Sequence, residues 1–417
     1  MSKRYITYGG EAMLHAVLEN GTRISMADKW HENELNDLRK QQRFICPICQ
    51  ERVILKLGTK RQWHFSHEQN HSCRIWLEPE SAYHLQGKLD IYKWLRKQGV
   101  KAGLEVYLPV IQQRPDVICK LNGKLYAIEY QCSSLSEERF LDRTNGYNRV
   151  GIIPIWILGG NRLRRKQGVH FQIQGFEWLA APFSPHHGNQ KFLIYFCPET
   201  KRWARLDRIT SYSSNRAIAS LSVMKYNSRI SVEELIAPTD HLPFNMSAWL
   251  KQKKKWRTQP MQPYSSKSYK TFSKWLYIHR IPPGLFPAEA GWFLPTQHEI
   301  VTSPHIWQSF LLIQCFLPKK KNERITLEEL AYSLTDFIMK GFMVSRENFK
   351  QSMNKFVSEL VYEYAELLTT FHILKKINSS HYVYQNEISI LSTYDEAIKR
   401  DQFLSKLKHN TPNLTSI

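Results

Sequence analysis

Two carboxylates that face each other across an expected β-hairpin are the strongest indication of chemistry in this sequence. The dipeptide Asn122-Gly123 separates two β-rich runs and favours a two-residue turn between antiparallel strands. Such a turn places Asp116 directly opposite Glu129. Opposed residues have Cβ atoms about 5 Å apart, so the two negative charges repel each other unless a cation or proton lies between them. The hairpin therefore predicts a divalent metal site, although both carboxylates could instead lie exposed on an edge hairpin.

The alternation of side chains along the two strands extends this prediction. Gln131 shares the face of Glu129, because side chains two residues apart point to the same side of a strand. The opposite face is apolar and suits a core; it carries Val117, Cys119, Leu121, Tyr126, Ile128 and Tyr130. The hairpin is thus expected to hold one polar face for chemistry and one apolar face for packing.

A second group of possible metal ligands lies near the N-terminus. A C-x2-C pair is followed by an expected hairpin and then by an H-x2-H pair, which together supply four ligands for tetrahedral zinc. The gap between the histidines is shorter than in a helical zinc finger, so a ribbon-type structural site is favoured. The alternative is a metal-free pair of cysteines beside histidines that cover a hairpin. The predicted ligands are Cys46, Cys49, His64 and His67, with His71 or Cys73 as substitutes.

Composition limits the class of protein. The chain has 417 residues, enough for two or three domains, and a net charge of +21, which favours nucleic acid over an anionic membrane as the partner. No apolar run reaches the roughly 20 residues of a membrane span, and the N-terminus lacks the apolar core of a signal peptide. The odd number of cysteines, seven, fits a reduced cytoplasm better than a disulfide framework.

Periodicity and turn residues divide the chain into three units, so we expect a multidomain α/β protein. Residues 1–75 form a small unit that contains the possible zinc ligands. Residues 76–235 read as helix, strand 104–110, the hairpin, helix 136–149 and strand 152–158, with further strands at 192–196 and 203–206. The basic run at 162–166 is expected to be a solvated loop. Residues 240–400 are basic and mainly helical, and the tail from residue 401 is expected to be poorly ordered.

The third unit begins with cations interleaved with aromatic residues, a pattern typical of single-strand binding. Lysines and arginines can follow phosphates, while Trp256, Tyr269 and Trp275 can stack on bases. The alternative is a linker with some buried aromatic residues. Residues 364–385 fit either the end of a winged helix or generic packing of a helix on a hairpin. The predicted DNA contacts in this unit are Lys253, Lys254, Lys255, Trp256 and Arg257.

Several motifs occur together and in order, and as a set they resemble the CoiA family of bacterial competence proteins. The resemblance covers the first half well, and the second half only by its helical, basic character. It implies a zinc-ribbon-like N-terminal domain, a restriction-endonuclease-like core of the PD-(D/E)xK type and a helical C-terminal domain. The motifs are Cys46-Pro-x-Cys49, His64-Phe-Ser-His67, Glu80-Ser-x-x-His84-x-x-x-Lys88, Arg114-Pro-Asp116-Val, Ile128-Glu-Tyr-Gln131, Arg139, Tyr147 and Pro154-Ile-Trp-Ile-Leu158.

The resemblance implies roles for individual residues. In nucleases of this type the positions of Asp116 and Glu129 bind Mg²⁺ or Mn²⁺, and an acid from the preceding helix, here Glu80, completes the site; Glu105 is the rival. Gln131 stands where these nucleases usually carry lysine; it can position a water but cannot neutralise charge. Arg139, Arg143, Tyr147 and Arg149 would bind phosphates, or form a solvated helix face, and His84 would be a helix-surface histidine or a catalytic one.

Two functions follow, and they belong to different classes. The first is a cytoplasmic, Mg²⁺-dependent nuclease that processes internalised, single-stranded DNA during natural transformation, together with recombination proteins. The second is a non-catalytic mediator of recombination that binds single-stranded DNA on a degenerate nuclease fold. A structural adaptor that binds acidic proteins is a third and weaker interpretation.

Overall fold

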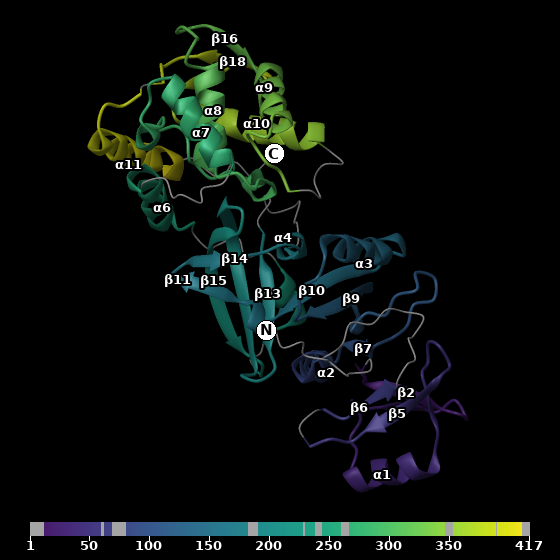
Figure 1. Ribbon diagram of the computed structural model, residues 1–417. Helices are drawn as coiled ribbons and strands as arrows, with labels where there is room; N and C mark the ends of the chain where they lie inside the picture. Colours follow the sequence, from purple (N-terminus) through teal and green to yellow (C-terminus); the bar gives the residue numbers. More distant parts are fainter. Residues whose placement is uncertain are drawn as a thin grey trace, which may run out of the picture.

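The chain folds into three regions that follow one another in sequence, each built around its own sheet (Figure 1). The computed structural model describes residues 12–59, 62–68, 81–181, 191–227, 230–237, 244–259, 267–346, 353–388 and 390–410. In Figure 1 the central sheet lies between the N-terminal region and the helical C-terminal region. The prediction of a mixed α/β chain is confirmed.

The N-terminal region is a six-stranded sheet with one helix, α1 (Glu32–Gln41), which is more than a bare zinc ribbon. Neighbouring strands run antiparallel. Strand β5 (Arg52–Lys56) pairs with β6 (His64–His67), as expected for a hairpin after the C-x2-C pair. The remaining strands are β1 (Ala12–Met13), β2 (His15–Leu18), β3 (Arg23–Ser25) and β4 (Phe44–Ile45), and the order in the sheet is β1-β6-β5-β4-β2-β3.

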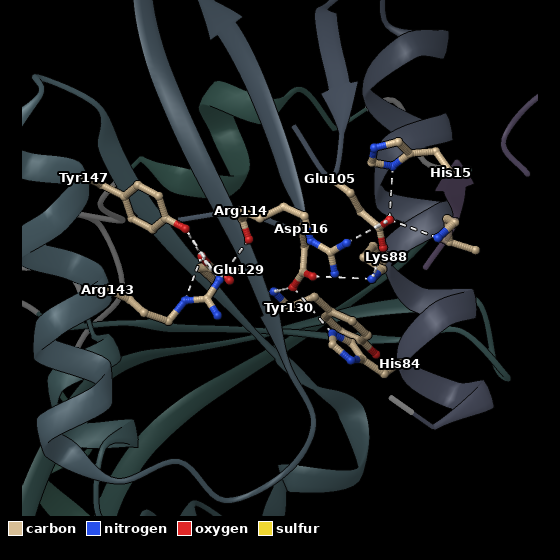
Figure 2. A network of polar contacts seen from close by, with 11 residues as sticks. His15, His84, Lys88, Glu105, Arg114, Asp116, Glu129, Tyr130, Arg143 and Tyr147 are labelled. Atoms are coloured by element: carbon tan, nitrogen blue, oxygen red, sulfur yellow. Dashed lines mark hydrogen bonds and ion pairs between the residues drawn. The ribbon is translucent and has the colours of Figure 1, made fainter. Parts of the chain in front are cut away.

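The central region is a nine-stranded sheet in the order β11-β12-β15-β14-β13-β10-β9-β8-β7. Strand β9 (Lys124–Gln131) runs parallel to β10 (Ile153–Gly159), which runs parallel to β13 (Leu193–Cys197). Helices α2 (Ala82–Lys97) and α3 (Glu137–Arg149) flank the hairpin (Figures 1 and 2). The other elements are β7 (Lys101–Leu104), β8 (Val117–Leu121), η1 (Gly160–Arg162), β11 (Arg164–Gln167), β12 (His170–Gln172), α4 (Glu177–Ala180), β14 (Arg202–Ser213), β15 (Arg216–Lys225) and α5 (Val232–Ile236).

The predicted hairpin and its register are confirmed. Leu121 pairs with Lys124, and Val117 pairs with Ile128, as a two-residue turn requires. Asn122 and Gly123 both have positive φ, at 47° and 80°, the conformation that these residue types adopt most readily. Continued by one residue, the register places Asp116 opposite Glu129. Local sequence chemistry alone therefore fixes the geometry of the two carboxylates.

The sheet differs from the expected one at two places. The strand expected at 104–110 is wrong in its position, because β7 ends at Leu104 and Glu105 takes a positive φ of 50° that an extended strand does not allow. The solvated loop expected at 162–166 is wrong as well: β11 occupies most of this run, and the buried Arg162 forms an ion pair with Glu177. The ion pair of Arg162 with Glu177 holds this polar segment next to the sheet, where its residues form β11.

The C-terminal region is mainly helical, as expected, with a small three-stranded sheet. From α8 onward the order is helix, strand, two helices and a hairpin, with sheet order β16-β18-β17, which is the arrangement of a winged helix. The first part of the tail expected to be poorly ordered, residues 401–410, is instead the end of α11 (Tyr394–Asn410), and the rest of that tail lies outside the described residues. The remaining elements are α6 (Met246–Thr258), α7 (Lys267–Ile278), η2 (Pro283–Leu285), η3 (Pro295–Glu299), α8 (Pro304–Cys315), β16 (Arg324–Thr326), α9 (Leu327–Met339), α10 (Met353–Thr370), β17 (Leu374–Lys376) and β18 (His381–Tyr384).

No helix among the described residues is both long and apolar enough to cross a membrane.

Candidate metal and nucleic-acid sites

Asp116 lies at the junction of the hairpin and helix α2, against cationic and hydrogen-donating groups (Figure 2). Its Oδ2 accepts a hydrogen bond from the backbone amide of Tyr130 at 2.8 Å and lies 3.4 Å from Nε2 of His84. Its Oδ1 lies 3.6 Å from Nζ of Lys88. Burial alone would raise the pKa of Asp116, but the charges of His84 and Lys88 outweigh it, so the pKa lies below its usual range. The carboxylate is thus held ionised.

Helix α2 delivers His84 and Lys88 to the same place because they are four residues apart on one helical face. The helix begins at a capped end, where the Ser81 hydroxyl accepts a hydrogen bond from the His84 amide at 3.2 Å. Gly87 permits the close approach to β9, since a Cβ atom there would lie 2.1 Å from the Tyr130 ring. A side chain at position 87 would therefore push the helix, and both basic groups, away from Asp116.

Glu129 is held by helix α3 on the other side of the hairpin (Figure 2). Its Oε1 accepts hydrogen bonds from Nε and Nη2 of Arg143, at 3.1 and 2.5 Å, and from the Tyr147 hydroxyl. Arg143 and Tyr147 are again four residues apart on one face. Burial raises the pKa of Glu129, and Arg143 works against that rise. The α3 face predicted to bind phosphates is therefore partly committed to Glu129.

Glu105, the alternative candidate for the third acidic residue of the site, is buried and bound by other protein groups. Its carboxylate is fully buried, with Oε1 2.5 Å from Nζ of Lys88 and Oε2 accepting from the Leu14 amide at 2.9 Å. His15 Nδ1 lies 3.2 Å from the same Oε2. Burial would raise the pKa of Glu105, but the charges of Lys88 and Arg114 hold it well below the usual range. Glu105 thus anchors the N-terminal region on the central one. Glu80, the first choice, lies outside the described residues.

Gln131 lies one step along the strand from Glu129, as predicted. Its Nε2 donates to the Ser133 hydroxyl at 2.9 Å and to the Ser133 carbonyl at 3.3 Å. This amide cannot supply the positive charge of the lysine that nucleases of this type carry. The lysine closest to Asp116 among the described residues is Lys88, 3.6 Å away, which comes from helix α2 instead of the strand.

The two carboxylates retain the donor atoms that a hard cation needs. Among the described residues, no hydrogen bond reaches Oε2 of Glu129, and Oδ1 of Asp116 has only the long contact to Lys88. Mg²⁺ typically binds one or two protein carboxylates and completes its octahedron with waters and substrate phosphates. Asp116 and Glu129 are therefore residues that could hold a hard divalent cation.

Three of the four predicted zinc ligands come together. The ligand atoms of Cys46, Cys49 and His67 all lie within 4.8 Å of one another, and Cys49 Sγ is 3.1 Å from His67 Nε2. The Ile48 amide points at Cys46 Sγ, 3.5 Å away. These spacings suit the vertices of a tetrahedron around an ion bound by sulfur and nitrogen at 2.0–2.3 Å. The cluster could hold a metal ion.

His64 is not part of this cluster. Its Nδ1 lies 2.8 Å from the Gln62 carbonyl oxygen. Because His64 and His67 are three residues apart in β6, they project from opposite faces of the strand, which the H-x2-H pattern did not reveal. The two substitutes named for the fourth ligand, His71 and Cys73, lie outside the described residues.

Three of the predicted DNA contacts are corrected by burial. Lys253 and Arg257 lie in the interior, where both form ion pairs with Asp401. Tyr147 is buried as well, with its hydroxyl on Glu129. These three side chains are unavailable to a nucleic acid in this structure. Trp256 is half-buried: it stacks on His305, with ring centroids 4.4 Å apart, and packs on the core.

The other predicted contacts remain at the surface. Lys254 and Lys255 are exposed on α6. Arg139 is exposed on α3, one turn before Arg143. The cations of α6 differ in burial because neighbouring residues of an amphipathic helix alternate between solvent and core. A run of cations in the sequence therefore contains both exposed and buried members.

The sequence motifs predicted only a general role for two residues that contact the carboxylates. His84 was expected to be a helix-surface histidine, and Arg143 one of several phosphate binders. A usable signal was present, because His84 and Lys88, like Arg143 and Tyr147, have the i, i+4 spacing that places two side chains on one helical face. The contacts of Glu105 with Leu14 and His15 had no such local signal.

The fold and site define a class: a central α/β domain with two opposed carboxylates, joined to an N-terminal sheet with a Cys/His cluster and a winged-helix-like C-terminal region. Residues 80–240 match the nuclease-like domain of competence protein CoiA, residues 27–76 its N-terminal domain and residues 244–398 its C-terminal domain.

The chain is 31% identical over 370 residues to the competence protein CoiA of Bacillus subtilis (strain 168), which covers 88% of this chain and 96% of that relative. It therefore belongs to the CoiA family, as its motifs predicted. No solved structure matches it.

Proposed function

We propose that the protein processes internalised DNA during natural transformation as a metal-dependent nuclease of the PD-(D/E)xK type. The observation that carries the proposal is the opposed pair Asp116 and Glu129 in the nuclease-like domain, each with one oxygen that accepts no hydrogen bond from the described residues. The name of the relative and the net charge of +21 support a role in competence and a polyanionic partner. The proposed partners are single-stranded DNA and recombination proteins of the cytoplasm.

The residues of the site divide the work of hydrolysis. When bound between Asp116 and Glu129, Mg²⁺ would polarise the scissile phosphate and acidify a water. Lys88 supplies the positive charge that Gln131 lacks, while Gln131 can orient a water through its amide. Arg143 is partly exposed and Arg139 is exposed, so both can contact phosphates beside the pair.

A cleavage assay tests this function directly. Purified full-length protein is incubated with single-stranded, duplex and branched DNA, with Mg²⁺ or Mn²⁺, beside a gel shift on the same substrates. We expect metal-dependent cleavage of at least the single-stranded substrate. Intact DNA in every lane would overturn the nuclease proposal.

The second candidate is a non-catalytic mediator that binds single-stranded DNA. It is favoured by the ionic partners of the carboxylates, since Arg143 pairs with Glu129 and Lys88 lies beside Asp116. It predicts retarded but uncut DNA in the assay above, with binding that falls steeply as salt rises.

A substitution of Lys88 tests whether its charge acts in catalysis at Asp116 or only pairs with buried Glu105. Lys88→Met is expected to lower the rate of cleavage about 100-fold, the order of magnitude for one preorganised charge or donor. The change also leaves buried Glu105 with one fewer cation, which costs stability.

The double variant K88M/E105Q distinguishes these two effects. It removes both charges of the Lys88–Glu105 pair, so it is expected to recover part of the lost thermal stability without recovering cleavage; buried Arg114, 3.7 Å from Glu105, keeps its charge and limits the recovery. If both recover together, Lys88 serves only to hold Glu105.

We propose that the Cys46, Cys49 and His67 cluster holds structural zinc. Elemental analysis of the purified protein is expected to find one zinc per chain. Cys49→Ser is expected to lose that zinc and destabilise the N-terminal sheet, whereas Cys315→Ser on α8 retains it. A folded, metal-free protein would contradict the zinc site.

A further inference from the structure

Helix α7 presents a row of lysines that ends in an exposed aromatic ring. Lys267, Lys270, Lys274 and Tyr277 recur at intervals of three and four residues, so they share one helical face. All three lysines are exposed, and the Tyr277 side chain is 84% exposed. Tyr277 is therefore accessible, unlike the aromatic residues Trp256, Tyr269 and Trp275 that the sequence pattern suggested, which pack on the core.

The charge of this face is unusually one-sided. Helices α6 and α7 contain no acidic residue. None of their exposed lysines forms an ion pair within the described part of the chain; they are Lys251, Lys254, Lys255, Lys267, Lys270 and Lys274. By contrast, the two buried cations of α6, Lys253 and Arg257, are already paired with Asp401. The outward positive charge is thus left for a partner.

The winged-helix-like arrangement offers another candidate helix, α10, and its charge argues against it. In helix-turn-helix proteins the second helix of the pair enters the major groove. Helix α10 carries the exposed Glu359, 3.8 Å from its one lysine, Lys355. Its other two acids, Glu363 and Glu366, are half-buried, and Glu366 pairs with Lys376 at 2.8 Å. Because its lysine is matched by an acid and it contains no arginine, α10 offers phosphates no net positive charge and is unsuited to read duplex DNA.

The packing of α7 also argues against a membrane surface. A helix that lies in a membrane interface must bury a broad apolar face in lipid. The apolar face of α7, with Phe272 and Leu276, is already buried in the domain core. Beyond it, only Tyr277 and Ile278 are exposed apolar residues, and both lie at one end of the helix.

We propose that the outward face of α7 binds single-stranded DNA, with Lys267, Lys270 and Lys274 on successive phosphates and Tyr277 stacked on a base. A protruding ring stacks on an unpaired base without the unstacking that insertion into a duplex requires, which favours a single strand over a duplex. The inference rests on the proposed function for its substrate class, but it does not depend on cleavage.

The test measures affinity for a labelled 30-nucleotide oligodeoxythymidylate by fluorescence anisotropy, using full-length protein without added Mg²⁺. Each phosphate contact on a single strand contributes about 0.7 to the salt slope, which makes three contacts worth roughly 50-fold at 0.15 M salt. K267Q/K270Q/K274Q is therefore expected to bind roughly 50-fold more weakly, with a slope reduced by about 2. Tyr277→Ala is expected to lose about 5-fold or more, the lower end of base stacking on an aromatic ring.

Matched variants separate this face from bulk charge. K320Q/K321Q/K399Q removes the same charge from exposed positions elsewhere, and Tyr332→Ala removes a tyrosine that is 78% exposed on α9. Both are expected to bind like the unaltered protein. Equal losses in test and control variants would overturn the proposal, as would binding to anionic phospholipid vesicles but not to the oligonucleotide. If binding behaves as expected while the cleavage assay fails, the surface stands and the nuclease function does not.

Discussion

Asp116→Asn is expected to abolish metal-dependent cleavage, lowering the rate by about 1,000-fold or more. The substitution keeps the shape of the side chain and a carbonyl oxygen that can accept from the Tyr130 amide, but removes the negative charge. A metal ion that stabilises a scissile phosphate supplies several kcal/mol, and each 1.36 kcal/mol corresponds to a factor of ten in rate. Loss of the ion should therefore remove most of the catalysis. The rate is measured by single-turnover cleavage of labelled DNA.

Two comparisons make this result specific to the site. Asp142→Asn on α3 removes a carboxylate that is exposed and outside the pair, and it should cut at the rate of the unaltered protein. Asp116→Asn should also keep its affinity for the oligonucleotide, because the α7 face lies on another region of the chain. Equal cleavage by Asp116→Asn and the unaltered protein would show that the activity comes from another site or another enzyme.

The features that could be predicted from the sequence are those governed by near neighbours in the chain. The hairpin register follows from Asn122 and Gly123, and the position of Asp116 opposite Glu129 follows from that register. The Cys46–Cys49 pair is equally local. In each case few residues separate the groups concerned, so turn chemistry and strand alternation fix their geometry.

The features that were missed depend on partners far away in the sequence. The Leu14 amide donates a hydrogen bond to Glu105, 91 residues away in the sequence, and no residue pattern near Glu105 indicates that contact. Arg257 meets Asp401 across 144 residues, so a buried ion pair was interpreted as a DNA-binding surface. A run of cations identifies a positive segment, but only the packed structure shows which of them are neutralised.

Asp401→Ala is expected to destabilise the C-terminal region by about 3–5 kcal/mol, the usual cost of breaking a buried ion pair. The Asp401 carboxylate accepts hydrogen bonds from Nε and Nη2 of Arg257, at 2.7 and 2.9 Å, and lies 2.9 Å from Nζ of Lys253. Burial lowers the pKa of Lys253 to about 8, an effect that Asp401 opposes, so Lys253 can lose its proton when the carboxylate is gone. Arg257 cannot, because a guanidinium stays charged in proteins. The penalty therefore falls mainly on Arg257.

Denaturant unfolding, monitored by tryptophan fluorescence, measures this loss of stability. The control is Asp395→Ala, which removes an exposed acid from the first turn of the same helix and should cost no more than about 1 kcal/mol. A triple variant, K253M/R257M/D401L, then tests the cause. Buried ion clusters can often be replaced by apolar residues of similar volume without loss of stability, whereas an orphaned charge cannot be tolerated. We expect the triple variant to recover most of the stability lost in Asp401→Ala and to bind single-stranded DNA as tightly as the unaltered protein. A large loss of binding in a stable triple variant would instead return Lys253 and Arg257 to the DNA-binding surface from which their burial removes them.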